Sequence, residues 1–251
     1  MEMAIKVHIV ALALMTFGFV ACSTSNEPQS SKERSMQPES SIQANLSDSF
    51  VNGRIVRTAN GNGYLKIMTI GTLEVPSGSI VACDPLVSFD ARPFAQPVPR
   101  GTYPVVLSIV KLNEDERVAY AKLLISNAPT TTWNPALLTE QNTKKSEPEF
   151  GYVVDTGTGS FMDAKAASML LKMLEDEVFE NNDTYSSLIV KEMEKSRVPT
   201  WAWANLKLDE SEGNLITFSS GWGDGRYPSY FGFDEQGNVT ELITDFRVLS
   251  Q

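Results

Sequence analysis

A glycine-rich stretch between Ser219 and Asp234 gathers residues that could bind a ligand or a partner. Three of its glycines, Gly221, Gly223 and Gly225, stand at alternate positions, and glycine lets the backbone adopt positive φ or approach another group closely. Loops of this kind on a rigid sheet often carry function, although they also serve as wide connections between strands. The candidate binding residues are Asp84, outside this stretch, and five within it: Trp222, Asp224, Arg226, Tyr227 and Tyr230.

The candidate catalytic groups are carboxylates and arginines. Asp155 begins an Asp-Thr-Gly sequence after two valines, which is the local form of an aspartic-protease turn. That chemistry needs two such carboxylates sharing a proton, and the chain has no second Asp-Thr-Gly or Asp-Ser-Gly. The remaining enzymatic hypothesis is a carboxylate-based hydrolase in which Asp155 and Asp224 act beside Arg117 or Arg226.

Asp155 and Asp163 also offer oxygen ligands of the kind that Ca²⁺ prefers. The spacing is not that of an EF-hand loop, because Ala166 occupies the twelfth position from Asp155. Asp163 follows Ser160 by three residues, which is the form of a capping box, so a capped helix behind a turn is the alternative. No cofactor is expected, because Met162 stands where a dinucleotide-binding fingerprint needs glycine.

Residues 1–21 have the layout of a secretory signal, with Lys6 before the apolar run Val7–Ala21. The run is too short to span a bilayer comfortably. It ends Phe19-Val20-Ala21-Cys22, which resembles the bacterial lipoprotein signal that is cleaved before a cysteine destined to carry the lipid. We therefore expect a protein held at the cell envelope, in the outer membrane, by a lipid on Cys22.

The histidine and cysteine counts exclude several enzyme classes. The one histidine is His8, inside the predicted signal, so Ser-His-Asp and Cys-His mechanisms have no base and zinc has no nitrogen ligand. Once Cys22 carries a lipid, Cys83 has no partner for a disulfide within the chain.

Residues 22–45 are rich in Ser, Gln, Glu, Asn and Pro and contain too few apolar side chains to form a core, so we expect a disordered tether. The formal net charge of the chain is −10. An acidic chain is a poor candidate for binding nucleic acid, which is contacted mainly by Lys and Arg. A basic protein partner at the cell surface fits the charge better.

Residues 46–251 are predicted to form a single α+β domain, mainly antiparallel β-sheet with a two-helix insertion and a C-terminal β-meander. The sequence Ala59-Asn60-Gly61-Asn62-Gly63 predicts a hairpin, and Asn113–Glu116 should join two long antiparallel strands. A second turn is expected at 76–78, between strands at 73–75 and 79–83. Helices are expected at 161–180 and 184–196, and the meander at 201–208, 215–220, 229–234 and 239–249.

Six motifs, in this order, resemble a bacterial family of domains of unknown function, the one numbered 4241. They are Asp84-Pro85, Pro99–Val105, Glu116–Ala121, Val154–Gly159, Ser219–Gly225 and Thr244–Phe246, and the likeness runs from about Gly71 to Leu249. The family has no settled activity to carry over. The resemblance implies that Asp84, Arg117, Asp155, Asp224 and Asp245 belong to the family pattern, either as a shared site or as a shared framework of turns.

Two functional hypotheses follow. The first is a binding module of the cell envelope that neutralises a basic protein partner, and the second is the histidine-free hydrolase, with or without Ca²⁺. An enzyme should show a concave pocket with two carboxylates near Arg117 or Arg226, whereas a binding module should show a broad exposed patch.

Overall fold

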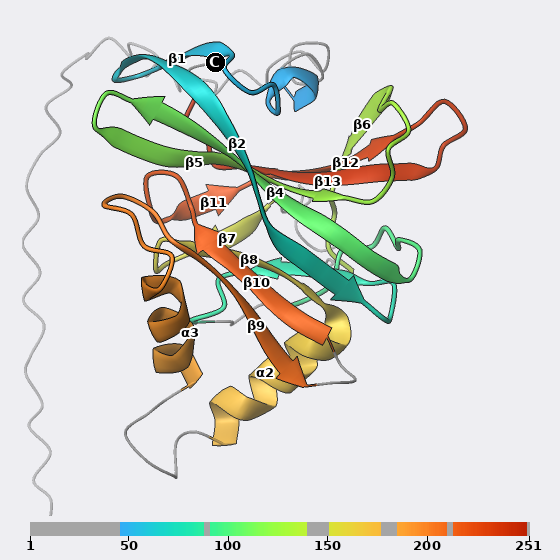
Figure 1. Cartoon of the computed structure of the whole chain (residues 1–251). Helices are drawn as coiled ribbons and strands as arrows, with labels where there is room; N and C mark the ends of the chain where they lie inside the picture. Colours follow the sequence, from blue (N-terminus) through green and yellow to red (C-terminus); the bar gives the residue numbers. More distant parts are fainter. Residues whose placement is uncertain (1–45, 88–90, 140–150, 177–184, 210–212, 250–251) are drawn as a thin grey trace, which may run out of the picture. The chain divides into compact units, whose positions relative to one another are not determined.

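The chain folds into three layers, which are two β-sheets and a pair of helices (Figure 1). We describe them from a computed structural model, which covers residues 46–87, 91–139, 151–176, 185–209 and 213–249. The predicted signal, Cys22 and the predicted tether lie outside the described residues. All described residues fall within one compact unit, residues 37–251.

The larger sheet has seven strands, and every pairing within it is antiparallel. The register of β2 against β4 shifts between Thr69 and Gly71, and such an irregularity bends a strand. Because of this bend, β2 also reaches over the smaller sheet, where it contacts β8, β9 and β10. In spatial order the strands are β1 (Ile55–Thr58), β2 (Gly61–Val75), β4 (Gly101–Leu112), β5 (Asp115–Leu124), β13 (Val239–Asp245), β12 (Ser229–Phe233) and β6 (Thr132–Pro135).

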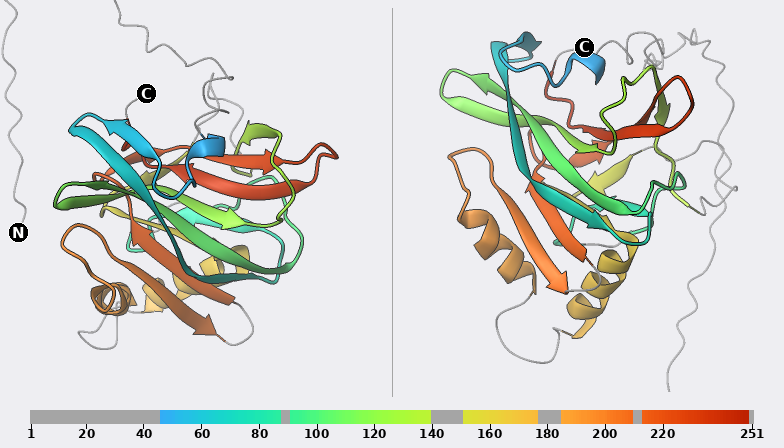
Figure 2. Two further views of the ribbon diagram at one scale, coloured as in Figure 1. Left: turned by 45° about the horizontal axis from the view of Figure 1, so that its top comes forward. Right: turned by 45° about the vertical axis from the view of Figure 1, so that its right-hand side comes forward.

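The smaller sheet has four antiparallel strands and lies between the larger sheet and the helices (Figure 2). Every residue of β8 is buried, because this strand is covered on both faces. Two further short strands, β7 (Tyr152–Val154) and β11 (Gly225–Tyr227), pair only with each other. The strands of the smaller sheet, in spatial order, are β3 (Ile80–Cys83), β8 (Thr158–Asp163), β10 (Gly213–Ser219) and β9 (Trp203–Asp209).

Helices α2 (Ala164–Asp176) and α3 (Tyr185–Glu194) pack on the outer face of the smaller sheet. The core beneath them is built from small and flexible side chains, including Ala166, Ala167 and Met193. The core between the two sheets is larger and contains a row of aromatic rings, in which Phe161 contacts Phe218 and Phe218 contacts Phe246. Aromatic pairs of this kind fix the relative position of the elements that carry them.

The structure confirms the predicted fold class and two of its hairpins. The fold is α+β, mainly antiparallel sheet, and both helices lie between Asp155 and Thr200 as expected. Strand β1 pairs with β2 around residues 58–61, and β4 pairs with β5 around Asn113. Asn113 has φ 53°, which a turn residue of this type tolerates.

The strands expected at 73–75 and 79–83 are both observed around a bend at 76–78, although the first belongs to β2 in the larger sheet and the second to β3 in the smaller one. Two details of the prediction are wrong. The predicted C-terminal meander is divided, since β9 and β10 lie in one sheet while β12 and β13 lie in the other. The segment from Phe161 is not helical, because β8 continues to Asp163 and α2 begins at Ala164.

Within the described residues, no helix combines the length and the apolar composition that crossing a membrane requires.

Candidate functional site

The turn after β7 and the glycine-rich loop before β11 lie against each other. The Ser220 N–H donates to the Gly157 carbonyl oxygen over 3.0 Å, and a Cβ built on Gly157 would lie 3.5 Å from the Gly223 Cα. Gly157, Gly221 and Gly223 all have positive φ, at 67°, 53° and 117°. These positive φ values favour glycine, because other residues would strain the backbone of the two turns.

Asp84 holds the first of these turns from behind. Its buried carboxylate accepts the backbone N–H groups of Asp155 and Thr156 over 2.9 and 2.8 Å, and the Thr156 hydroxyl over 2.8 Å. Charge-assisted hydrogen bonds to backbone N–H groups are among the stronger ones in proteins. Asp84, which the sequence marked as a binding residue, therefore fixes the shape of the Asp155–Gly157 turn and does not face solvent.

Tyr227 holds the second turn in the same manner. Its hydroxyl donates to the Gly223 carbonyl oxygen over 2.7 Å, and its ring packs against Phe246 with the centroids 5.0 Å apart. Burial raises the pKa of Tyr227, and the charge of Asp224 raises it further. The phenol therefore stays protonated and serves as a fixed donor inside the loop.

Trp222 projects from this loop and is stacked against Arg117. The indole is 43% exposed, and the guanidinium carbon of Arg117 lies 4.8 Å from its ring centroid. Arg117 is held in turn by Asp115, with 2.9 Å between Arg117 Nε and Asp115 Oδ1. The structure thus joins two of the predicted residues, Trp222 and Arg117. Asp115 was not predicted, although residues two apart on a strand share a face.

Asp155 and Asp224 are both exposed on the two touching turns. The Asp224 carboxylate makes no hydrogen bond or ion pair with any residue that the structure describes. The opposing charge expected from Arg226 is absent, because the Arg226 guanidinium donates to the Gly151 carbonyl oxygen over 3.1 Å instead. We name the exposed group formed by Arg117, Asp155, Trp222 and Asp224 the Trp222 cluster.

Asp245 ends β13, and Tyr230 lies in the neighbouring strand β12 of the larger sheet. Burial raises the pKa of Asp245 to about 6, against the lowering effect of the Arg247 N–H, which donates to its carboxylate over 2.7 Å, and of the Arg247 charge. Burial, and then the charge of Asp245, raises the pKa of Tyr230 to about 12. Tyr230, predicted to bind a ligand, is a buried side chain near the partly buried Asp245.

The two weak metal candidates are not brought together. Asp163 is fully buried and accepts the Ser77 N–H and hydroxyl over 2.9 and 2.6 Å and the Lys165 N–H over 2.8 Å. Asp155 precedes β8 whereas Asp163 ends it, a separation on the order of 15–20 Å along an extended strand. Among the residues with described positions, no three His, Cys, Asp or Glu side chains gather as a metal site would require.

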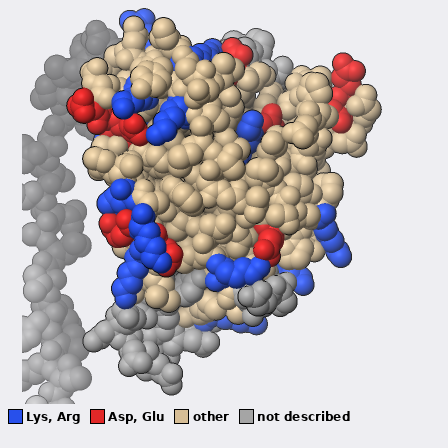
Figure 3. All heavy atoms as spheres, viewed as in Figure 1, with Lys and Arg blue, Asp and Glu red and all other residues tan. Residues whose placement is uncertain are grey.

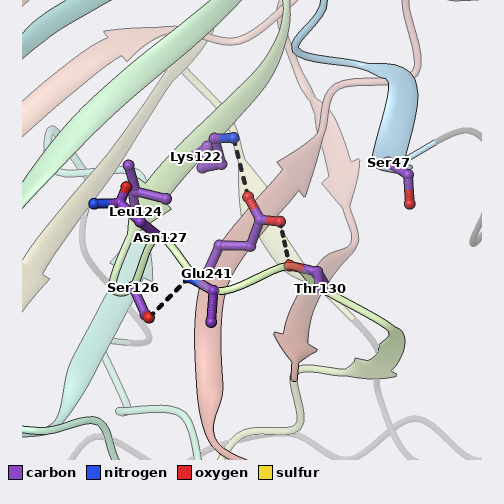
Figure 4. Close-up of a pocket in the computed structure, with 8 residues that line it drawn as sticks. Ser47, Lys122, Leu124, Ser126, Asn127, Thr130 and Glu241 are labelled. Atoms are coloured by element: carbon purple, nitrogen blue, oxygen red, sulfur yellow. Dashed lines mark hydrogen bonds and ion pairs between the residues drawn. The ribbon is translucent and has the colours of Figure 1, made fainter. Parts of the chain in front are cut away.

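A shallow groove of about 280 Å³ lies elsewhere, at the far end of β5 and β13 (Figure 4). The Lys122 ammonium and the Glu241 carboxylate lie 3.0 Å apart on its wall, and the Thr130 hydroxyl donates to Glu241 over 2.7 Å. No sequence pattern indicated this groove, because the pair joins residues on strands that are distant in the chain. Its two charged groups are paired with each other, so the groove offers little unpaired charge to a ligand.

Comparison with known proteins matches residues 73–244 to a family described as Protein of unknown function (DUF4241). Neither the comparison with curated proteins nor that with solved structures found a match. The matched segment contains the whole Trp222 cluster and the Asp84 carboxylate behind it. Since the match covers more than half of the chain, the protein belongs to the DUF4241 family.

Proposed function

We propose that the protein is an exported lipoprotein of the cell envelope whose domain binds a basic protein partner through the Trp222 cluster. The single observation that supports binding is the half-exposed Trp222 side chain, stacked on Arg117 at 4.8 Å. Tryptophan and arginine are the residue types that most often dominate the energy of protein interfaces. An exposed tryptophan on a turn that is already fixed loses little conformational entropy on binding.

A basic partner is supported by the charges around the tryptophan. Asp155 and Asp224 are exposed on the two turns beside it, and the Asp224 carboxylate makes no contact with the rest of the described chain that a partner would have to break. The formal net charge of −10 adds a long-range attraction that speeds the encounter with a basic protein.

The location is supported by the sequence alone. The apolar run Val7–Ala21 ends at a cysteine in the form of a lipoprotein signal. Replacing Cys22 by Ser should move the protein from the membrane fraction to the soluble fraction if a lipid holds it there. Membrane association that is unchanged in Cys22→Ser would contradict the lipid anchor and leave the binding proposal standing.

A photo-crosslinking amino acid placed at residue 222 in living cells tests the partner. We expect it to capture one basic envelope protein, while the same amino acid at Leu188, which is equally exposed at 43% on α3, should not capture it. The purified partner should then bind the wild-type chain at least about tenfold more tightly than Trp222→Ala.

Charge variants complete the test. Asp224→Asn should weaken binding, whereas Glu235→Gln, which removes the same charge at an exposed site on another turn, should not. If the two variants bind equally well, or if residues 222 and 188 capture the same proteins, the Trp222 cluster is not the binding site.

Asp245 favours the enzymatic alternative. A carboxyl group with a pKa of about 6 can exchange protons near neutral pH, as a hydrolase needs. It lies on β13, which pairs with β5, the strand that carries Arg117. If hydrolysis of a glycoside or peptide substrate were found and Asp245→Asn abolished it without unfolding the protein, the binding proposal would give way to this one.

A further inference from the structure

Strand β1 and the start of β2 form a hairpin at the upper left of Figure 1, and its outward face is unusually apolar. Ile55 is 77% exposed, and Tyr64, its partner in the antiparallel register, is 45% exposed. Val51, just before the hairpin, is 49% exposed. Directly paired residues point to the same face, so Ile55 and Tyr64 present adjoining apolar surface to solvent.

The same face is basic. Arg57 and Lys66 lie two residues from Ile55 and Tyr64, and side chains two apart on a strand share a face. Neither makes an ion pair with another residue in the described part of the chain. No Asp or Glu occurs between Asp48 and Glu74, in a chain whose formal net charge is −10. The hairpin is therefore a cationic segment of an acidic protein.

The nearest acidic side chains on the neighbouring hairpin are mostly paired. Glu116 lies 3.5 Å from Lys111, and Asp115 is held by Arg117. Glu114 alone is an exposed acid at the tip of that hairpin without such a pair among the residues described. Figure 3 shows Lys and Arg side chains over the upper part of this view, where Figure 1 places β1, with a few acidic ones at its left edge.

The hairpin is also joined to the place where the described chain begins. Arg54 forms an ion pair with Asp48 at 3.1 Å, and the Ser108 hydroxyl donates to the Ser49 carbonyl oxygen over 2.5 Å. The helical turn at residues 46–48 and the hairpin are thus one rigid piece. In the chain, this piece directly follows the segment that leads back to Cys22.

We propose that the outward face of the β1–β2 hairpin rests on an anionic lipid surface, with Ile55, Tyr64 and Val51 in the headgroup layer and Arg57 and Lys66 on lipid phosphates. This inference rests on the proposed lipid anchor. Apolar side chains flanked by Lys and Arg are the composition of interfacial segments, and polybasic segments are attracted by anionic lipids. A lipid on Cys22 would keep the hairpin at high local concentration near the membrane, so a weak contact is enough.

The test uses the mature lipidated protein in which Ile55→Cys carries a fluorophore sensitive to polarity. Cys83 is buried and should not react in the folded protein. Vesicles of phosphatidylcholine should be compared with mixed vesicles that contain about three parts of phosphatidylcholine to one part of phosphatidylglycerol. We expect the emission at residue 55 to rise about twofold with phosphatidylglycerol, and the emission from Leu188→Cys, the matched control on α3, to stay unchanged.

Replacing both Arg57 and Lys66 by Glu should abolish this rise. The proposal is overturned if the emission at residue 55 does not rise, if it rises equally with and without phosphatidylglycerol, or if it rises as much as the emission at residue 188. A rise that depends on protein concentration without vesicles would also overturn it, because the hairpin would then pair with a second copy.

Flotation of the protein with the same vesicles tests the lipid anchor on Cys22 independently of the hairpin contact. If the protein does not float, the lipid on Cys22 is absent, and the label at residue 55 is then measured in Cys22→Ser, whose one other native thiol is the buried Cys83, with an excess of phosphatidylglycerol vesicles added to the protein. A rise under those conditions supports the hairpin contact without the anchor, and no rise contradicts it.

Discussion

At each end of β8 a buried aspartate holds a neighbouring turn. Asp84 accepts the N–H groups of the turn that precedes β8, and Asp163 accepts the Ser77 groups and the Lys165 N–H where β8 leads into α2. The first turn carries the exposed Asp155 and lies against the loop that carries Trp222, whereas the second leads directly into α2. A buried carboxylate thus holds a turn at both ends of β8. At one end the turn belongs to the candidate site, and at the other it only connects β8 to α2.

The largest effect should come from Asp84→Ala. This change removes the acceptor of two backbone N–H groups and one hydroxyl inside the protein, which should lower the free energy of unfolding by about 3–5 kcal/mol. Urea denaturation measures it. The exposed neighbour Asp155→Ala should change stability by less than about 0.5 kcal/mol. Equal stability of the two variants would mean that Asp84 does not hold the turn.

Asp163→Ala should lower the free energy of unfolding by about 2–3 kcal/mol, because it removes both the cap of α2 and the acceptor for Ser77. Crosslinking from residue 222 should nevertheless persist in the folded variant, since the closed end of β8 takes no part in the Trp222 cluster. Loss of crosslinking at an unchanged fold would show that the two ends are coupled.

Asp245 should make stability depend on pH in an identifiable direction. Its pKa of about 6 in the folded protein exceeds the value of about 3.9 in an unfolded chain. The folded state therefore holds this proton more firmly, and the resulting stabilisation is complete below about pH 4 and lost as the pH rises through about 6. The Asp245→Asn variant cannot ionise at this position. Its free energy of unfolding should therefore be about 1–2 kcal/mol higher than that of the wild type at pH 7.

A denaturation series from pH 4 to pH 8 gives the measurement. The difference in the free energy of unfolding between Asp245→Asn and the wild type should grow as the pH rises. A difference that stays constant across the range would show that burial does not perturb this carboxyl group.

The smallest change in stability should come from Asp224→Asn, at less than about 0.5 kcal/mol, because the carboxylate is exposed. Gly223→Val should cost about 1–2 kcal/mol through strain alone, since the glycine has φ 117° and open space around it. If only Gly223→Val impaired partner binding, the loop would be scaffold and Asp224 would not contact the partner.

The sequence predicted those parts of the fold that depend on neighbours in the chain. The β1–β2 and β4–β5 hairpins follow from local turn residues, and both are observed. Which sheet a strand joins depends on distant contacts. Nothing local distinguishes β3, which pairs with β8, from a hairpin partner of β2. The error at Phe161 arose because β8, with the sequence Thr-Gly-Ser-Phe-Met-Asp, is buried throughout and does not show the alternation of apolar and polar residues that marks a half-buried strand.

The candidate site was predicted in part for the same reason. Trp222 and Asp224 stood out locally, because glycines surround them. That Arg117 stacks on Trp222, and that Asp84 holds the Asp155 turn, depends on pairings across the sheets. The pattern of residue types indicated which groups take part, but it did not separate those that face solvent from those that support them.

Strand β13 occupies the middle of the larger sheet, between β5 and β12, yet it is later in the chain than every other described strand. Until residues 239–245 are available, β5 has an open edge and the seven-stranded sheet cannot close. Contacts between such distant segments form slowly, because loop closure must precede them. A chain that emerges from its N-terminus onward therefore cannot complete the larger sheet until residues 239–245 have appeared, and the strands made earlier must wait for them.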